Sequence, residues 1–284
     1  NLGENYSVHY HSAGHIPGAL MFELIGDKRL LFTGDLNTVD TRLVKGTKPV
    51  PCDILFMEGT YAGREHRNRN QLEREFLEKI EEVINRGGTA IIPAFAVSRS
   101  QEILLVLKDA GYNVWFDGMG KKISKIYLKY PKYLRSVNDL KKALKNINMV
   151  HSEQSRKSAM KAEVIVTSSG MMDGGPILSY MNKFKNDKKS AVLLTGYQIP
   201  GTNSRLLIEK GKLNFYGVIE KVNCEVKYYD FSAHAGHSEL VEFAQKCNPE
   251  KIILFHSANR TPLAEALKDT AEVLTPMKGE RFSL

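Results

Sequence analysis

The sequence predicts an α/β protein in which a mainly parallel sheet is covered by helices on both faces. Strand-like and helix-like segments alternate between residues 67 and 215, and this alternation is typical of such a sheet. Outside that stretch, three short apolar runs each lead to a turn that carries His, Asp or Glu. The 284 residues, 42% hydrophobic and 25% charged, suffice for one large core or two ordinary ones.

Composition narrows the protein class. No apolar run approaches the ~20 residues of a membrane span, and no signal peptide is visible, so we expect no membrane partner. The three cysteines are scattered and none has Cys-x-x-Cys spacing, which favours thiols rather than ligands in a reducing, cytoplasmic setting. The net charge of +8 permits an anionic partner such as nucleic acid, although lysine-rich surfaces also serve solubility.

The first elements are a hairpin and a third apolar run. Residues 19–26 and 29–34 read as two strands joined by a turn at Asp27-Lys28, with the usual hairpin signals. A Gly/Pro-rich turn with His15 precedes them, and the second strand ends at Asp35. Residues 53–58 form the third run, which ends on Glu58.

The middle of the chain begins with a helix. Apolar residues at Leu72, Phe76, Ile80 and Val83 have helical spacing, and two glycines that follow end the helix. Similar patterns predict the remaining elements in chain order: helix 71–85, strand 89–95, helix 100–110, strand 113–116, helices 120–130 and 138–146, strand 163–168, helix 176–185, strand 191–195 and helix 203–210.

A further unit is expected from about residue 216. A strand at 225–230 leads into a small-residue loop that carries His234, before a helix at 238–247. The apolar strand 251–255 delivers His256, and a helix at 262–268 and a strand at 272–274 follow.

Five residues at strand ends or turns could carry chemistry together: His15, Asp35, Glu58, His234 and His256. Imidazole nitrogen and carboxylate oxygen are the ligands of zinc-type sites. A single histidine at a strand end is more often structural. If the outer segments fold together, however, the five converge at one sheet edge and form a metal site with a neighbouring proton donor.

A glycine-rich loop is a second candidate. A strand runs into Ser168, Ser169 and Gly170 and then opens a helix; backbone N–H groups and hydroxyls there can cradle an anion, or the loop is a plain connection. Arg99 and Arg205 are either phosphate clamps or ordinary surface arginines.

These motifs together resemble the metallo-β-lactamase superfamily and, within it, the β-CASP nucleases, which include ribonuclease J and the nuclease subunit of the cleavage and polyadenylation specificity factor. The resemblance is closest to the archaeal homologues. Residues 12–19 look like the third family motif, 32–35 like the fourth, 57–61 like motif A, 231–234 like motif B and 254–256 like motif C; residues 92–96, 169–171 and 195–198 are similar to further signatures.

The resemblance implies a metallo-β-lactamase αββα sandwich interrupted by a β-CASP domain. Residues 1–66 and 216–284 would be the middle and C-terminal parts of the first domain, and residues 67–215 the inserted one. The family's second motif, His-x-His-x-Asp-His, does not occur in the chain, which starts at Asn1. We therefore expect the N-terminal half of the sandwich and its zinc ligands upstream, and no activity from this stretch alone.

The implied activity is zinc-dependent hydrolysis of single-stranded RNA in RNA processing or decay, in endonuclease or 5′-3′ exonuclease mode. His15 would bind one zinc ion, Asp35 would bridge two, and His256 would bind the second. His234 would protonate the leaving oxygen, oriented by Glu58. A His at motif C accompanies RNA substrates in this family, whose members are often dimers or associate with other RNA-processing factors.

Two alternatives remain. A non-catalytic β-CASP subunit would bind RNA or a nuclease partner, but it would be expected to lose ligands at several motifs, whereas five motifs are present here. Ser257-Ala258 stands where Gly-Glu is usual, so the loop after His256 differs locally. A small-molecule hydrolase conflicts with the long insertion and the basic charge.

Overall fold

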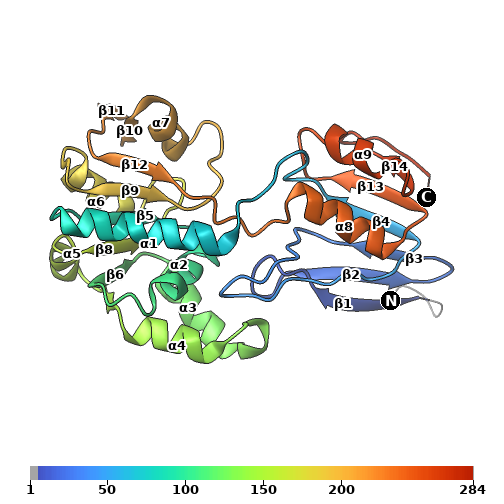
Figure 1. Cartoon of the computed structure of the whole chain (residues 1–284), viewed down its shortest axis with the longest axis horizontal. Coiled ribbons are helices and arrows are strands. Elements are labelled where there is room, and N and C mark those ends of the chain that lie inside the picture. Colours follow the sequence, from blue (N-terminus) through green and yellow to red (C-terminus); the bar gives the residue numbers. More distant parts are fainter. Residues whose placement is uncertain (1–5, 284) are drawn as a thin grey trace. The chain divides into compact units, whose positions relative to one another are not determined.

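The chain folds as two compact units in the computed structural model, which describes residues 6–283 (Figure 1). Unit 1 combines the residues up to His66 with those from Ala233 onward, and unit 2 is Arg67–Ser232. Two segments distant in sequence thus build unit 1, while unit 2 is one continuous stretch.

Unit 1 is built on a six-stranded sheet in the order β1-β2-β3-β4-β13-β14. β1 to β3 are antiparallel, whereas β3, β4, β13 and β14 run parallel. The predicted hairpin is confirmed as β2–β3. The strands and helices of unit 1 are β1 (Ser7–Ser12), β2 (Leu20–Ile25), β3 (Arg29–Phe32), β4 (Ile54–Glu58), α8 (His237–Cys247), β13 (Lys251–Phe255), α9 (Thr261–Leu267) and β14 (Glu272–Leu274).

The core of unit 1 lies between one face of this sheet and two helices. Met21, Leu31 and Leu55 on the strands are fully buried in one cluster with Phe243 of α8 and Leu263 of α9. Every second strand residue faces this cluster because side chains alternate along a strand. Burying such apolar side chains stabilises the unit by about 1.5–3 kcal/mol each.

Unit 2 contains a six-stranded parallel sheet in the order β12-β9-β5-β8-β6-β7, and a separate hairpin, β10–β11. Its strands are β5 (Ala90–Pro93), β6 (Val114–Asp117), β7 (Asn148–Met149), β8 (Val164–Thr167), β9 (Ala191–Leu194), β10 (Lys212–Phe215), β11 (Val218–Lys221) and β12 (Glu225–Tyr228). Its helices are α1 (Arg69–Asn85), α2 (Arg99–Leu107), α3 (Gly120–Lys129), η1 (Pro131–Tyr133), α4 (Val137–Lys145), α5 (Glu153–Ala159), α6 (Pro176–Phe184) and α7 (Asn203–Lys210).

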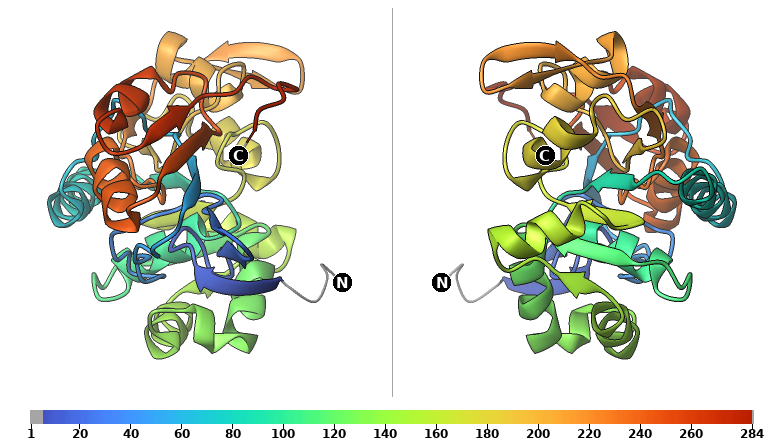
Figure 2. Two further views of the ribbon diagram at one scale, coloured as in Figure 1. Left: turned by 90° about the vertical axis from the view of Figure 1, so that its right-hand side faces the viewer. Right: turned by 90° about the vertical axis from the view of Figure 1, so that its left-hand side faces the viewer.

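Helices cover both faces of this sheet, as the alternation predicts (Figures 1 and 2). Tyr180 and Met181 of α6 share a buried cluster with Ile91, Ile165 and Val192 of three neighbouring strands. The alternate residues of the same strands face the other way, where α1 and α2 pack on β5 and β8. The parallel α/β architecture is therefore confirmed.

Unit 2 extends beyond the expected boundary at 215/216. The strand expected at 225–230 is β12, which pairs in parallel with β9, so the compact unit continues to Ser232. Sequence patterns also missed β1, β7, α5, β10 and β11. β1 and β11 are largely exposed strands, and such strands lack the buried alternation on which prediction depends.

The three cysteines are buried free thiols. Cys52 and Cys247 lie in the core of unit 1, and Cys224 lies in that of unit 2. Among residues 6–283, no helix is long and apolar enough to cross a membrane.

Candidate metal centre

Five side chains meet at one edge of the unit 1 sheet. Asp35 follows β3, Glu58 ends β4 and His256 follows β13. These strands are adjacent and parallel, so their carboxyl ends lie side by side. His15 comes from the turn after β1 and His234 from the loop before α8. The residues that stand out in the sequence are therefore brought together by strand order.

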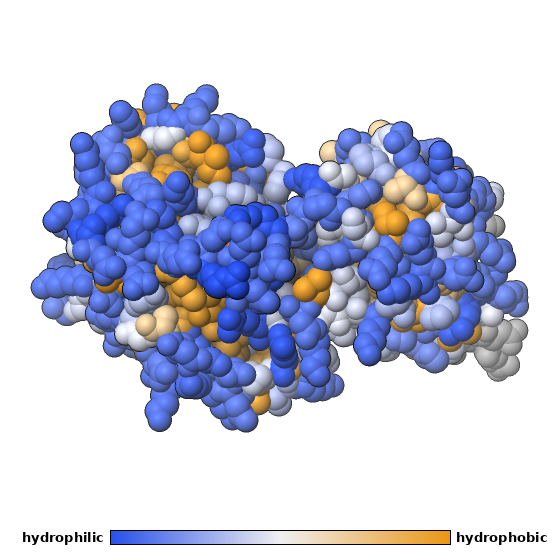
Figure 3. All heavy atoms as spheres, in the orientation of Figure 1, coloured by the Kyte–Doolittle hydropathy of each residue, from blue (hydrophilic) through white to orange (hydrophobic). Residues whose placement is uncertain are grey.

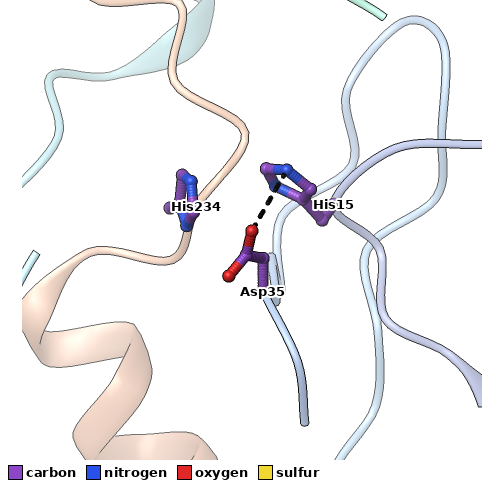
Figure 4. A group of neighbouring side chains, drawn as sticks. All are labelled: His15, Asp35 and His234. Atoms are coloured by element: carbon purple, nitrogen blue, oxygen red, sulfur yellow. Dashed lines mark ion pairs between the residues drawn. The ribbon is translucent and has the colours of Figure 1, made fainter. Parts of the chain in front are cut away.

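A tight turn fixes His15. The N–H of Ala13 donates to the carbonyl of Ala19 at 3.0 Å and closes the turn. Gly14 has φ of +72°, and a Cβ there would lie 2.2 Å from the carbonyl oxygen of Asn37, so only glycine fits. Nδ1 of His15 donates to the carbonyl of Ala233 at 2.7 Å. This bond directs Nε2 toward Asp35, 3.9 Å away (Figure 4).

Asp35 presents one carboxylate oxygen to each of two histidines. Oδ2 faces His15, and Oδ1 lies 2.7 Å from Nδ1 of His256. The backbone of His256 has φ of +54°, a left-handed conformation that costs of order 1–3 kcal/mol outside glycine and is concentrated at functional sites. Asp35 is 35% exposed and His256 56% exposed, so both are accessible to a ligand.

Glu58 is fully buried and held from three sides. Oε1 accepts the N–H of Leu36 at 2.9 Å and Nδ1–H of His234 at 2.8 Å, and Oε2 accepts the N–H of Thr60 at 3.1 Å. Burial alone raises the pKa of a carboxyl. The bonds from His234, Thr60 and Leu36 outweigh it and hold the pKa of Glu58 below its usual value. Glu58 is therefore an ionised, fixed acceptor for His234.

His234 lies between Glu58 on one side and His15 and Asp35 on the other. Its ring centroid is 4.5 Å from that of His15 and 6.4 Å from that of His256. Figure 4 shows the carboxylate of Asp35 between the rings of His15 and His234. The carbonyl of His234 accepts Nε2–H of His66 at 3.0 Å, which anchors the loop.

The donor atoms fit a divalent metal. Two overlapping groups have ligand atoms within 4.8 Å of one another: His15, Asp35 and His234, and Asp35, Glu58 and His256. Burial and the neighbouring His234 lower the pKa of His15, which favours the neutral imidazole that metal binding requires. Glu58 already accepts three hydrogen bonds, so His15, Asp35, His234 and His256 are the members of these groups that remain candidates for holding a metal.

The phosphate candidates lie in unit 2. Ser168 and Ser169 follow β8; Ser168 is buried, and its Oγ accepts the N–H of Met119 at 3.0 Å. A Cβ on Gly170 would lie 2.9 Å from the nitrogen of Phe95, so the loop packs closely against the end of β5. Nη1 of Arg99 donates to the carbonyl of Thr195 at 2.6 Å. These residues share the carboxyl edge of the sheet.

Arg205 is placed differently from the other phosphate candidates. It lies on α7, and its Nε donates to Glu209 one turn later at 2.6 Å. Its side chain is 43% exposed. The guanidinium is thus accessible but already paired with a carboxylate.

Sequence reasoning missed the residues that hold the site in place. Thr60 donates to both Glu58 and the carbonyl of His256, and His66 packs on Tyr61 with ring centroids 4.2 Å apart. The bond of Thr60 to His256 and the bond of His66 to His234 join segments more than 160 residues apart. Only the proximity of Thr60 and Tyr61 to Glu58 in motif A could have indicated them.

Two family models match parts of the chain. Residues 100–207 match the model of the Beta-Casp domain, and residues 219–276 match that of the Zn-dependent metallo-hydrolase RNA specificity domain. The first match lies within unit 2. The second begins in unit 2 and ends in the C-terminal part of unit 1.

Similar proteins extend over nearly the whole chain. A probable RNase MJ4 of Methanocaldococcus jannaschii is 42% identical over 99% of this chain and 69% of its own length. RNase aCSPSF2 of Saccharolobus solfataricus is 38% identical over 99% of the chain and 59% of its own length. Cleavage and polyadenylation specificity factor subunit 3 of Dictyostelium discoideum is 29% identical over 96% of the chain and 38% of its own length. The chain thus spans 69% or less of these relatives, and it belongs to the β-CASP ribonuclease family of the metallo-β-lactamase superfamily.

Proposed function

We propose that the complete protein is a zinc-dependent ribonuclease that hydrolyses phosphodiester bonds of single-stranded RNA. The observation that carries this proposal is the meeting of His15, Asp35 and His256 beside the Glu58–His234 pair at one sheet edge. Relatives named as ribonucleases and a domain named for RNA specificity support RNA as the substrate. Metal ligands that lie beside a proton donor suit the hydrolysis of a phosphodiester.

His15, Asp35 and His256 would hold the metal. Asp35 faces a histidine with each oxygen, which suits a carboxylate shared between two zinc ions. The three donors leave coordination positions for water, substrate or further protein ligands. When bound, zinc supplies a Lewis acid that activates water and neutralises phosphoryl charge.

His234 would protonate the leaving oxygen. Its Nδ1–H is held by Glu58 at 2.8 Å, so Nε2 is the atom that exchanges the proton. The negative charge of Glu58 favours the imidazolium form, as a general acid requires. The amides of Leu36 and Thr60 keep the carboxylate in place while the histidine changes charge.

Unit 2 would contact the RNA backbone. We include Ser168, Ser169, Gly170, Arg99 and Arg205 in the proposal as phosphate contacts. Backbone N–H groups and arginines suit phosphate oxygens, and the first four residues share one sheet edge.

End-labelled RNA and metal analysis of the complete protein test the proposal. We expect bound zinc and metal-dependent cleavage, and loss of both zinc and cleavage in His256→Ala. His151→Ala, an exposed histidine of unit 2, is the matched control and should cleave normally. Product lengths distinguish endonuclease from 5′-3′ exonuclease action.

Two results contradict the proposal. If His256→Ala cleaves as fast as the unsubstituted protein, the metal assignment is wrong. If the complete protein binds RNA but neither zinc nor cleavage is detected, it is a non-catalytic subunit.

A further inference from the structure

The excess positive charge of the protein is concentrated in one short segment. Between Gly120 and Lys145 the chain has nine Lys and Arg and one acidic residue, Asp139. The net charge of this segment equals the +8 of the whole chain, and the other 258 residues contain 31 basic and 31 acidic residues. The segment comprises α3, η1 and α4 and is called the basic segment below.

Most of these charges lack a carboxylate partner. Asp139 pairs with Lys108, which lies outside the segment, and Lys121 and Lys142 pair with Asp117 and Asp109. Across residues 6–283, no ion pair to a carboxylate is formed by the remaining lysines of the segment, which are Lys122, Lys125, Lys129, Lys132, Lys141 and Lys145. Their charges are therefore available to an anion.

Helical periodicity places these lysines on the outside. The side of α3 with Ser124 and Tyr127 is buried, whereas Lys122, Lys125 and Lys129 are exposed at i, i+3 and i+7, which is one stripe of a helix. Leu140 and Ala143 of α4 are buried, and Lys141 and Lys145 are exposed one turn apart.

Both helices lie at an outer end of unit 2. They pack on α2, and they form its lower end in Figures 1 and 2 (green). The surface over α4 is hydrophilic in Figure 3.

Exposed tyrosines lie between the two rows of lysines. Tyr130 is 55% exposed and Tyr133 is 37% exposed, and both are in the connection that includes η1. Nζ of Lys132 lies 4.9 Å from the ring centroid of Tyr133. Positive charge combined with exposed aromatic rings is the composition of surfaces that bind single-stranded nucleic acid, since bases stack on the rings.

We propose that the basic segment is a docking surface for the backbone of single-stranded RNA, distinct from the metal centre of unit 1. This inference rests on the proposed ribonuclease function and assigns it a second RNA-binding surface. A membrane partner fits less well, because amphipathic helices bind membranes through a continuous apolar face. The apolar residues Leu140 and Ala143 of α4 are buried against the protein, and the exposed Ile126 of α3 adjoins Lys125 in the chain. An acidic protein is the competing partner.

Salt-dependent binding tests the proposal. Binding of a fluorescent, unstructured RNA of about 30 nucleotides would be measured without divalent metal, so that no cleavage occurs, between roughly 50 and 200 mM salt. One variant of the complete protein replaces five lysines of the segment: K122Q, K125Q, K129Q, K141Q and K145Q. The control removes the same charge from exposed lysines elsewhere in unit 2: K183Q, K188Q, K210Q, K212Q and K227Q.

The segment variant should bind RNA at least about tenfold more weakly, with a log–log salt slope shallower by about 0.7 for each phosphate that a lysine no longer neutralises. The control should retain most of the affinity. Equal melting temperatures would show that both variants fold. An unchanged slope in the segment variant, or an equal weakening in the control, overturns the proposal; unchanged binding assigns the lysines to an acidic protein or to solubility.

Cleavage assays separate this inference from the proposed function. In a protein that cleaves RNA, the segment variant should raise KM for the long RNA and leave kcat and the cleavage of RNA of about six nucleotides unchanged. A raised KM for both lengths would overturn the separate surface. A protein that cleaves no RNA contradicts the ribonuclease proposal, while the binding comparison still decides whether the segment contacts RNA.

Discussion

Glu58 in unit 1 and Asp117 in unit 2 are both buried carboxylates at strand ends, but they have different hydrogen-bond partners. Each is the last residue of a parallel strand, each is buried, and hydrogen bonds hold the pKa of each below its ordinary value against the effect of burial. Asp117 accepts Arg156 Nε at 2.8 Å, Tyr180 O–H at 3.0 Å and the N–H of Gly118 at 2.6 Å. Glu58 accepts two amides and a histidine.

The partner decides what a buried carboxylate does. A guanidinium stays charged at any accessible pH, so the cluster around Asp117 is a permanent ion pair that joins β6, α5 and α6. An imidazole changes charge near neutral pH, so Glu58 and His234 can take part in proton transfer. We therefore predict that substitutions at the Glu58–His234 pair lower catalytic activity, whereas substitutions at Asp117 lower the stability of unit 2.

The largest expected effect is on catalysis. We expect His234→Ala in the complete protein to lower kcat about 10²- to 10⁴-fold, the usual contribution of a general acid. Added imidazole should restore part of the rate, which a purely structural role would not allow. Glu58 keeps its bonds to Leu36 and Thr60, so the variant should still fold, with a loss of about 1–3 kcal/mol for the missing hydrogen bond to a buried carboxylate. An unchanged kcat would remove His234 from the mechanism.

Asp117→Ala should destabilise unit 2 by about 3 kcal/mol, because it leaves Arg156 and Tyr180 without their acceptor. Urea unfolding followed by the fluorescence of Trp115, the single tryptophan of the sequence, measures this loss. Asp109→Ala removes an exposed ion pair with Lys142 and should unfold at the same urea concentration as the unsubstituted protein. If Asp117→Ala also unfolded at the same urea concentration as the unsubstituted protein, the Asp117 cluster would not stabilise unit 2.

Low pH should remove the stabilisation that ionised Asp117 contributes. The pKa of Asp117 is lowered in the folded state, so its stabilisation is complete above the unfolded pKa of about 3.9 and is lost as pH falls through the lower folded value. Asp117→Asn has no such ionisation. The difference in urea midpoint between the unsubstituted protein and Asp117→Asn should therefore be constant at neutral pH and shrink below about pH 4. A constant difference down to about pH 3 would contradict the ion-pair interpretation.

The smallest effect is expected from Tyr180→Phe. It removes one hydrogen bond to Asp117 at 3.0 Å but keeps the ring in the core, so the loss should be about 1 kcal/mol. The same Trp115 unfolding curve measures it. A loss as large as that of Asp117→Ala would mean that Tyr180, and not Arg156, is the essential partner.

The sequence predicted the parallel sheet of unit 2 and the site residues at the edge of the unit 1 sheet because both depend on local pattern. Phe76 and Ile80 have the spacing of a buried helix face, and Glu58 ends an apolar run. A strand at 225–230 was predicted, but its place beside β9 in the sheet of unit 2 was not. Pairing of β12 with β9 is set by contacts between residues distant along the chain.

The site shows the same limit. Asp35 and His256 stand out as polar residues after apolar strands, and His15 stands out as the histidine of a Gly/Pro-rich turn. The carbonyl of Ala233, which orients His15, and the bond of Thr60 to His256 do not, because a backbone acceptor leaves no residue-type signal. The Asp117–Arg156 pair was not anticipated either, since its partners are 39 residues apart.

The cleavage rate of the Asp35→Asn variant, measured beside Asp117→Asn in the complete protein on end-labelled RNA, tests the central claim most directly. Asn keeps the shape of Asp but removes the charge that faces His15 and His256. We predict that Asp35→Asn abolishes cleavage, and that Asp117→Asn cleaves at the unsubstituted rate per folded molecule. Cleavage by Asp35→Asn at the unsubstituted rate would contradict a metal-dependent nuclease site at this sheet edge.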